Sequence, residues 1–235
     1  MVRQSMTRII TIVSRDGHEF DAACEGDAKN ARGGVVVLQE IFGLNSHIRS
    51  LAARFADAGF FVVAPALFDR AERGVELDYD ALGKERGLAL KTQVDTETLL
   101  DISATIAKVA TAGPVSIVGF CWGGSLAWRA ATSLSDLAGS VAYYGGEIPA
   151  NANLTARCPV LTHFGTQDKS IPTEQVKAFV KAQAASNPQV VTHTYDADHG
   201  FNCDARSQYD QAAANLAWRR TLNFLDEVSD TSPHR

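Results

Sequence analysis

The feature that most constrains the fold is the sequence Gly-Phe-Cys-Trp-Gly-Gly at positions 119–124, which directly follows a β-branched apolar run at 115–118. It matches the nucleophile-elbow pattern G-x-S-x-G, with a cysteine in place of the serine. In such an elbow a strand turns at once into a helix. The apex residue is therefore strained, and the flanking residues must be small where the chain passes close to itself. The pattern predicts a sharp turn at Cys121, followed by a helix whose N-terminus favours a thiolate. The alternative is a tight turn that holds an inert, buried cysteine.

Strand-like and helix-like segments alternate along the rest of the chain. This alternation predicts a single α/β domain over residues 1–235, with a mostly parallel central sheet and helices on both faces, as in the α/β-hydrolase fold. The first two strands, joined near Asp16 and Gly17, are expected to pair as an antiparallel hairpin at one edge. Ser46 is expected to cap the first helix, and a polar tail is expected after residue 227. The expected strands lie at 9–14, 19–24, 34–38, 60–64, 115–119, 140–144, 160–165 and 190–195, and the expected helices at 47–58, 92–110, 125–133, 173–185 and 209–228.

Two polar loops follow later strands and supply an acid and a base. The sequence Gly-Thr-Gln-Asp ends at Asp168, and Asp-Ala-Asp-His-Gly-Phe contains His199. The order nucleophile, acid, base is the one that an α/β-hydrolase requires. We therefore predict that Cys121 attacks a carbonyl carbon, that His199 transfers the proton and that Asp168 orients the imidazole. Three other carboxylates lie too close in sequence to His199 to take that last role: Asp196, Asp198 and Asp204.

An acyl-transfer site also needs two backbone N–H groups that face the developing oxyanion. One is expected from Trp122, the residue after the nucleophile, and the other from Ile41 in the sequence Gln-Glu-Ile-Phe-Gly at 39–43. The alternative for Gln39 and Glu40 is a polar strand end that faces solvent. Tyr144, at the end of a strand, is expected either to line the pocket or to lie in the core.

Composition narrows the possible partners and compartments. The net charge of −5 comes without a basic stripe, so nucleic acid is not an expected partner. No apolar run reaches the roughly 20 residues that span a bilayer, and the arginines near Met1 are followed by no apolar run typical of a signal peptide. A reduced, cytoplasmic setting without a cysteine metal site is expected, because the four cysteines are widely spaced and form no metal-ligand pattern: Cys24, Cys121, Cys158 and Cys203.

The chain resembles the dienelactone hydrolase (carboxymethylenebutenolidase) family. The resemblance rests on Gln-Glu-Ile-Phe-Gly at 39–43, the cysteine elbow at 119–124, Tyr-Tyr-Gly at 143–145 and His-Gly-Phe at 199–201. It extends over nearly the whole chain. The cysteine elbow together with Gln-Glu-Ile-Phe-Gly is far more specific than either motif alone.

The resemblance implies a substrate and further site residues. Members of the family hydrolyse the lactone ring of carboxymethylene-butenolides in aromatic degradation and use no metal or organic cofactor. The residue that matches Glu40 helps to ionise the nucleophilic thiol when substrate binds. Arginines hold the substrate carboxylate in the family. Arg86 is the best candidate for the arginine in the loop after the fourth strand, with Arg73 as its rival. Cys203 falls where the best-known members have a second arginine, and Arg206 lies three residues further on.

These features leave several alternatives open. The charged segment 69–86 follows the carboxyl end of a strand, where ligands bind in α/β sheets, or is simply a solvated loop. A broader carboxylesterase or thioesterase would use the same residues. A protein of another class would use Cys121 as a redox-sensing thiol, with Cys203 as the resolving thiol. The expected oligomeric state is a monomer.

Overall fold

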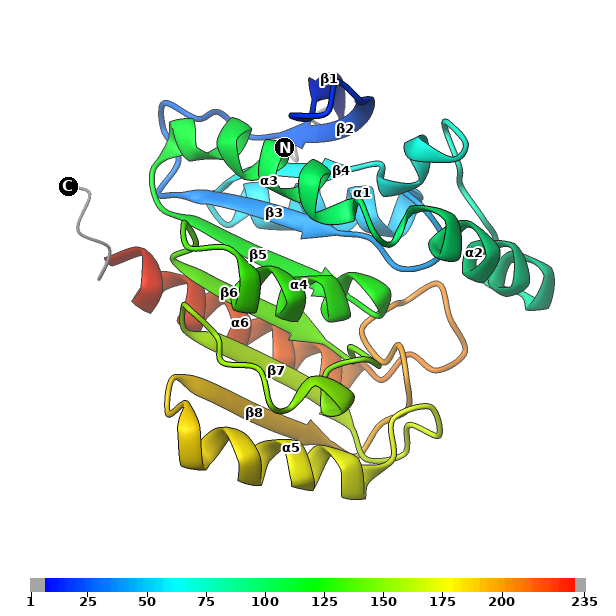
Figure 1. The fold of residues 1–235 in the computed structure, drawn as a ribbon, viewed down its shortest axis with the longest axis vertical. Helices are drawn as coiled ribbons and strands as arrows, with labels where there is room; N and C mark the ends of the chain where they lie inside the picture. Colours follow the sequence, from blue (N-terminus) through cyan, green and yellow to red (C-terminus); the bar gives the residue numbers. More distant parts are fainter. Residues whose placement is uncertain (1–6, 231–235) are drawn as a thin grey trace. The chain divides into compact units, whose positions relative to one another are not determined.

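Between residues 7 and 230, the part of the chain that the computed structural model describes, strands and helices alternate (Figure 1). They form two units, residues 1–115 and 116–235. The predicted single domain over residues 1–235 stays a prediction. Residues 1–6 and 231–235, which include most of the expected polar tail, lie outside the described residues.

The first unit holds four strands in the spatial order β1-β2-β4-β3. The first two pair in antiparallel fashion across the turn at Gly17, which confirms the predicted hairpin. The second strand pairs with β4 in antiparallel fashion, and β3 and β4 run parallel. The bounds are Arg8–Val13 for β1, Glu19–Glu25 for β2, Gly34–Leu38 for β3 and Phe61–Pro65 for β4.

Helices cover both faces of this sheet. In Figure 1, α3 (Thr98–Val109) lies in front of β3 and β4, and α1 (Ser46–Asp57) lies behind them. The predicted cap of α1 was wrong by one residue, because Asn45 lies at the N-cap and its side chain accepts a hydrogen bond from the Ile48 N–H at 3.2 Å. Short 3₁₀ turns lie at Leu67–Arg70 and Ala110–Ala112.

The helix α2 (Ala81–Val94) occupies a segment that was predicted in part as a loop and in part as the start of a helix over 92–110. Asp80 begins it by accepting a hydrogen bond from the Gly83 N–H at 2.7 Å. Its buried residues are Gly83, Gly87, Leu90 and Val94. A Cβ on Gly87 would overlap the carbonyl oxygen of Ile41, so the inward face requires glycine where an apolar stripe would be expected.

An ion-pair cluster joins Arg70 to α3 and to the first hairpin. Its guanidinium donates twice to the Asp101 carboxylate, at 2.7 Å each, and twice to Asp16, at 2.9 and 3.3 Å. The Asp101 side chain is only 1% exposed.

Removing one partner of a buried pair leaves an uncompensated charge, so Asp101→Ala is expected to lower the free energy of unfolding by about 3 kcal/mol. Urea denaturation measures this loss, with Asp57→Ala at the exposed end of α1 as the control. A loss below about 1 kcal/mol would contradict the buried pair.

The second unit contains four parallel strands in the spatial order β5-β6-β7-β8. The predicted bounds of the last two match the structure. The bounds of the strands are Val115–Phe120 for β5, Gly139–Tyr143 for β6, Val160–Gly165 for β7 and Val190–Tyr195 for β8, and a 3₁₀ turn lies at Pro149–Asn151. Residues of β5, β6 and β7 are buried throughout, as predicted for strands covered on both faces, whereas Val191 and Thr194 of β8 are exposed.

Three helices cover the sheet of the second unit: α4 (Trp122–Ser133), α5 (Thr173–Ser186) and α6 (Gln211–Asp230). In Figure 1, α4 lies in front of the strands and α6 behind them. Trp128 on α4 meets Phe179 on α5 edge to face, with ring centroids 5.3 Å apart. The helix α6 extends to Asp230, so residues 228–230 belong to it rather than to the predicted tail.

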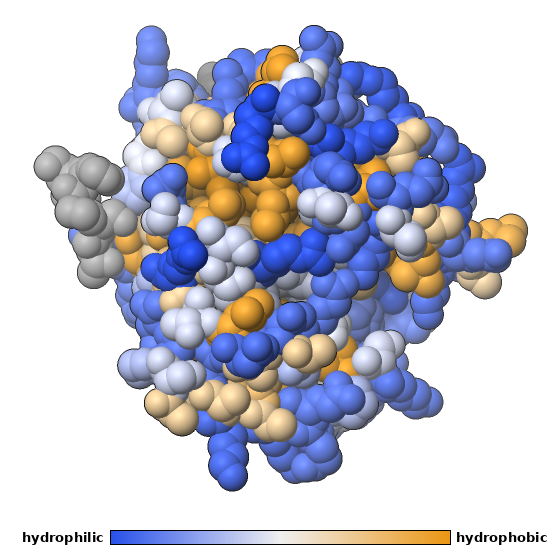
Figure 2. Space-filling view, in the orientation of Figure 1, coloured by the Kyte–Doolittle hydropathy of each residue, from blue (hydrophilic) through white to orange (hydrophobic). Residues whose placement is uncertain are grey.

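The visible surface is mostly hydrophilic, with small hydrophobic patches between the charged groups (Figure 2). No helix among residues 7–230 is both long enough and apolar enough to span a membrane. The large apolar side chains that are exposed come from several elements: Ile9, Val13, Leu82, Leu88, Leu154, Val180, Val191 and Tyr209.

Candidate active site

The elbow at Cys121 has the predicted geometry. Cys121 lies between β5 and α4 with a φ of 55° and a ψ of −114°, a strained conformation for a residue other than glycine. Its N–H donates to the Tyr143 carbonyl at 3.0 Å. A Cβ on Gly119 would overlap the carbonyl oxygen of Gly123, which explains why the residue two before the cysteine must be small. The thiol is thus presented at the N-terminus of α4 and is partly exposed.

The second unit brings Cys121, His199 and Asp168 together. The imidazole Nε2 of His199 lies 3.2 Å from the Cys121 Sγ, and its Nδ1 lies 2.7 Å from the Asp168 Oδ2. The Asp168 side chain is fully buried, and its other oxygen accepts hydrogen bonds from the N–H groups of Ser170 and Ile171 at 2.8 and 3.2 Å. The backbone therefore holds the carboxylate toward the imidazole.

The environment of His199 favours its charged form. Burial alone would lower its pKa, but the Cys121 thiolate and the Asp168 hydrogen bond outweigh that effect and raise the pKa to about 10. A charged imidazolium beside the sulfur stabilises a thiolate. The geometry therefore places a readily protonated imidazole beside the sulfur, as acyl transfer through a cysteine requires.

The loops that carry the acid and the base are fastened to each other. The N–H of Thr166 donates to the Tyr195 carbonyl at 2.7 Å, and the N–H of Gln167 donates to the Ala197 carbonyl at 3.0 Å. The Gln167 side chain also donates to Asp196 at 2.8 Å. Asp198 accepts from the N–H of His199 at 2.6 Å. Asp196 and Asp198 thus have other hydrogen-bond donors, whereas Asp168 faces Nδ1.

Aromatic rings pack around the imidazole, and one of them belongs to Tyr144, which was expected to line the pocket or to lie in the core. Tyr144 has a φ of 39°, and its N–H donates to the His163 carbonyl at 2.7 Å. Its ring centroid lies 5.1 Å from that of His199 and 5.4 Å from that of Phe201. Tyr144 is fully buried and packs against His199, whereas its predicted substrate-binding role stays a prediction.

A buried polar network lies next to these rings. The Nδ1 of His163 lies 2.8 Å from the Tyr195 hydroxyl, and its Nε2 lies 3.1 Å from the Thr221 hydroxyl. Thr221 in turn meets the Tyr143 hydroxyl at 2.7 Å. Burial, with the charges of His193 and Arg220, lowers the pKa of His163 well below its usual value. His163 is therefore a neutral core residue, in agreement with its predicted place inside a strand.

The predicted arginines lie in different surroundings. Arg206 lies against Gly200. A Cβ added to Gly200 would be 2.7 Å from the Arg206 Nη1, so the guanidinium is close to the residue after His199. Arg86 lies on α2 and pairs with Glu72, and both side chains are about half exposed. Arg73 donates to the Glu19 carbonyl at 2.6 Å. The substrate-binding roles of Arg86 and Arg206 stay predictions.

The first unit buries the Gln-Glu-Ile-Phe-Gly segment. Both Gln39 and Glu40 are fully buried, so the alternative of a polar strand end in solvent was wrong. The Gln39 side chain accepts from the Leu67 N–H at 3.1 Å, and Glu40 accepts from the Tyr79 hydroxyl at 2.8 Å. The predicted roles of Glu40, and of Ile41 and Trp122 as oxyanion donors, stay predictions.

The remaining cysteines are buried. Cys158 lies just before β7, and burial raises the pKa of its thiol to about 12. Cys24 lies within β2 and Cys203 in the loop after His199. Cys24 also accepts a hydrogen bond from Arg8 at 3.0 Å.

Comparisons with known proteins agree with the sequence motifs. The sequence matches the dienelactone hydrolase family over residues 20–229. It is 33% identical over 232 residues to carboxymethylenebutenolidase 1 of Cupriavidus pinatubonensis, covering 95% of this chain and 98% of the relative. It is also 33% identical to the carboxymethylenebutenolidase of Pseudomonas putida over 238 residues, covering 97% of this chain and all of the relative.

Solved structures give the same fold. A structure from Klebsiella pneumoniae that is named for dienelactone hydrolase is 28% identical, with a TM-score of 0.76 over 94% of this chain and 99% of that one. An esterase of Pyrococcus furiosus is similar in fold alone, at 16% identity and a TM-score of 0.71 over 94% of this chain and 91% of that one. These similarities confirm the predicted α/β-hydrolase fold class.

The family match covers well over half of the chain, and two full-length relatives exceed 30% identity. The predicted resemblance and the predicted enzyme class are both confirmed. The chain therefore belongs to the dienelactone hydrolase family and is an ester or lactone hydrolase of that family.

Proposed function

We propose that this enzyme opens a small, anionic lactone, or cleaves an activated ester, through a thioester formed on Cys121. The observation that carries the proposal is the continuous contact from Asp168 through His199 to the Cys121 sulfur at an elbow. Each contact supplies a step that acyl transfer needs, namely an ionised nucleophile, a proton donor and a group that fixes the imidazole tautomer.

The acylation step uses the thiolate and the imidazolium. The Cys121 sulfur attacks the carbonyl carbon, and the carbonyl electron pair moves onto the oxygen. Collapse of this tetrahedral intermediate breaks the bond to the ring oxygen, which takes the proton from His199. The product is a thioester on Cys121, with the freed hydroxyl still attached to the acyl group when the substrate is a lactone.

Deacylation reverses the roles. Neutral His199 removes a proton from water, and the resulting hydroxide attacks the thioester carbon. Cys121 leaves as the thiolate, and the imidazolium beside it is restored. The N–H groups of Trp122 and Ile41, the donors predicted from their positions in the sequence, would stabilise the oxyanion in both steps.

The substrate class rests on the relatives and on Arg206. The two relatives from Cupriavidus and Pseudomonas are named carboxymethylenebutenolidases, and a guanidinium near His199 suits a substrate carboxylate. A broader carboxylesterase is the second candidate, because Cys203 is buried at the position for which the resemblance implies an arginine. The monomeric state, the cytoplasmic location and a role in aromatic degradation stay predictions.

Substrate profiling separates the two candidates. We expect kcat/KM for cis- or trans-dienelactone to exceed that for 4-nitrophenyl acetate. Arg206→Met, which keeps much of the side chain's apolar stem, is expected to raise KM for dienelactone more than KM for the neutral ester. A preference for the neutral ester would favour the carboxylesterase.

The redox-sensing alternative predicts instead that oxidation joins Cys121 to Cys203 through a disulfide. Mass spectrometry of the parent would detect this disulfide, and it would be absent from Cys203→Ser.

A further inference from the structure

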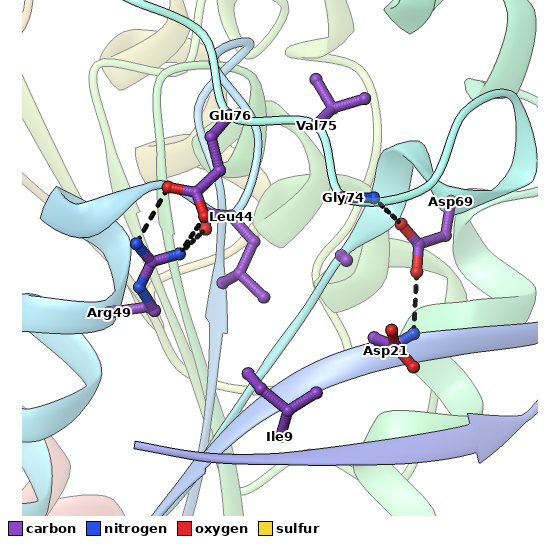
Figure 3. A pocket seen from close by; sticks show the side chains of 9 residues that line it. Ile9, Asp21, Leu44, Arg49, Asp69, Gly74, Val75 and Glu76 are labelled. Carbon is purple, nitrogen blue, oxygen red and sulfur yellow. Dashed lines mark hydrogen bonds and ion pairs between the residues drawn. The ribbon is translucent and has the colours of Figure 1, made fainter. Parts of the chain in front are cut away.

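The segment 71–80, here called the strap, lies across the loop that contains Glu40. Arg49 on α1 donates to both carboxylate oxygens of Glu76, at 2.6 and 2.9 Å, as Figure 3 shows. Glu76 also forms a β-bridge with Gly43, and the Leu77 N–H donates to the Phe42 carbonyl at 2.9 Å. The strap is therefore fastened to the 39–45 loop by backbone as well as by charge.

The strap is also fastened at the end where it leaves the sheet. Asp69, which is buried, accepts from the N–H of Gly74 at 3.2 Å and from the N–H of Asp21 at 2.8 Å (Figure 3). At the other end Asp80 caps α2. Tyr79, one residue before that cap, thus has a backbone position that is determined on both sides.

Tyr79 reaches back from the strap to Glu40. Its hydroxyl lies 2.8 Å from the Glu40 Oε2, and its ring packs on Phe42 with centroids 4.5 Å apart. Besides Tyr79, the first unit places the titratable His47 of α1 near Glu40. A ring nitrogen of His47 lies within 4.8 Å of a Glu40 carboxylate oxygen. Glu40 itself is fully buried, so a hydrogen-bond donor determines where its carboxylate points.

The direction of the Tyr79 hydroxyl follows from the cap of α1. The Asn45 Oδ1 accepts from the Ile48 N–H, so its amide nitrogen faces the Tyr79 oxygen, at 3.1 Å. An amide nitrogen only donates, so the Tyr79 oxygen is the acceptor of that bond. The hydroxyl proton is therefore directed to Glu40. Asn45 thus donates to Tyr79 and Tyr79 donates to Glu40, so both hydrogen bonds point toward the carboxylate.

We propose that Tyr79 is a positioning residue that holds the Glu40 carboxylate in one orientation. The inference rests on the proposed function and on the role that the resemblance implies for Glu40, which is to help ionise Cys121. Loss of the hydroxyl leaves the Glu40 carboxylate without this donor and therefore less well oriented.

The test is a double-mutant cycle on Tyr79→Phe and Glu40→Gln, with 4-nitrophenyl acetate and trans-dienelactone as substrates. Tyr79→Phe keeps the ring on Phe42 and removes only the hydroxyl. It is expected to lower kcat/KM about tenfold, the size of effect that one hydrogen bond to a charged group gives. The loss should fall on kcat more than on KM, because Tyr79 acts through the Glu40 carboxylate and does not bind the substrate. Adding Tyr79→Phe to Glu40→Gln should lower the rate no further, because the hydroxyl acts through the carboxylate.

Tyr209→Phe is the matched control, because Tyr209 is 38% exposed in the second unit and its loss should leave the rate unchanged. Thermal unfolding of each variant verifies that the fold is retained. A Tyr79→Phe rate equal to the parent's, with a slow Glu40→Gln, would overturn the role of Tyr79 alone. Equal rate losses from Tyr79→Phe with and without Glu40 would also overturn it. A parent-like Glu40→Gln would overturn the inference together with the role of Glu40, whereas the proposed function itself is tested separately by Cys121→Ala.

Discussion

Cys121→Ala is expected to lower kcat for lactone or ester hydrolysis by at least about 10⁴-fold, because removal of a catalytic nucleophile leaves only the residual rate from binding and the oxyanion donors. No other cysteine can replace it, since Cys24, Cys158 and Cys203 are buried. Steady-state hydrolysis of dienelactone and of 4-nitrophenyl acetate measures the loss.

Cys158→Ala is the control for that variant. Its thiol has a pKa raised to about 12 by burial, and it lies before β7 rather than at the elbow. Its activity should stay within about threefold of the parent, the change that a small loss of packing far from the chemistry would give. Substantial turnover by Cys121→Ala, with its fold intact, would rule out the cysteine mechanism.

Asp168→Asn is expected to lower kcat by about 10³- to 10⁴-fold with little change in structure, as happens when a triad carboxylate becomes an amide. The amide can donate to Nδ1 of His199, which stabilises the wrong tautomer. The substitution also removes a negative charge that raises the pKa of His199, so a smaller fraction of the imidazole beside Cys121 is protonated. The rate of alkylation by iodoacetamide at neutral pH should fall with kcat, because both depend on the thiolate.

The matched control is Asp196→Asn, in the same loop as His199. Asp196 accepts from Gln167 and is exposed, so its amide variant should keep kcat within about tenfold. If the two variants lost the same amount of activity, the assignment of Asp168 as the orienting acid would be wrong. A fully active Asp168→Asn would have the same meaning.

The elbow and the two catalytic loops were predictable because their signals are local. A strand followed by Gly-x-Cys-x-Gly determines the turn at Cys121, and β7 and β8 end at the predicted residues just before the loops of Asp168 and His199. The chain order of the three residues then predicted their meeting, which depends on the fold class rather than on any single contact.

The features that were missed depend on contacts between distant segments. The inward face of α2 begins with Gly83 and Gly87, so its apolar periodicity is absent although Asp80 caps it. Tyr79 and Glu40 are 39 residues apart, and nothing in either local sequence pairs them. The place of Tyr144 after a strand could not decide between the pocket and the core, and in the structure it is fully buried with its ring packed against His199.

The central claim is that turnover requires the sulfur of Cys121, and stoichiometric alkylation tests it most directly. The enzyme is treated with iodoacetamide to graded extents, peptide mass spectrometry measures the modified fraction of Cys121, and dienelactone hydrolysis is followed in the same samples. The account predicts that activity falls in proportion to the modified fraction of Cys121 and reaches the background rate when that thiol is fully blocked. Undiminished hydrolysis by enzyme that is fully alkylated at Cys121 would contradict it.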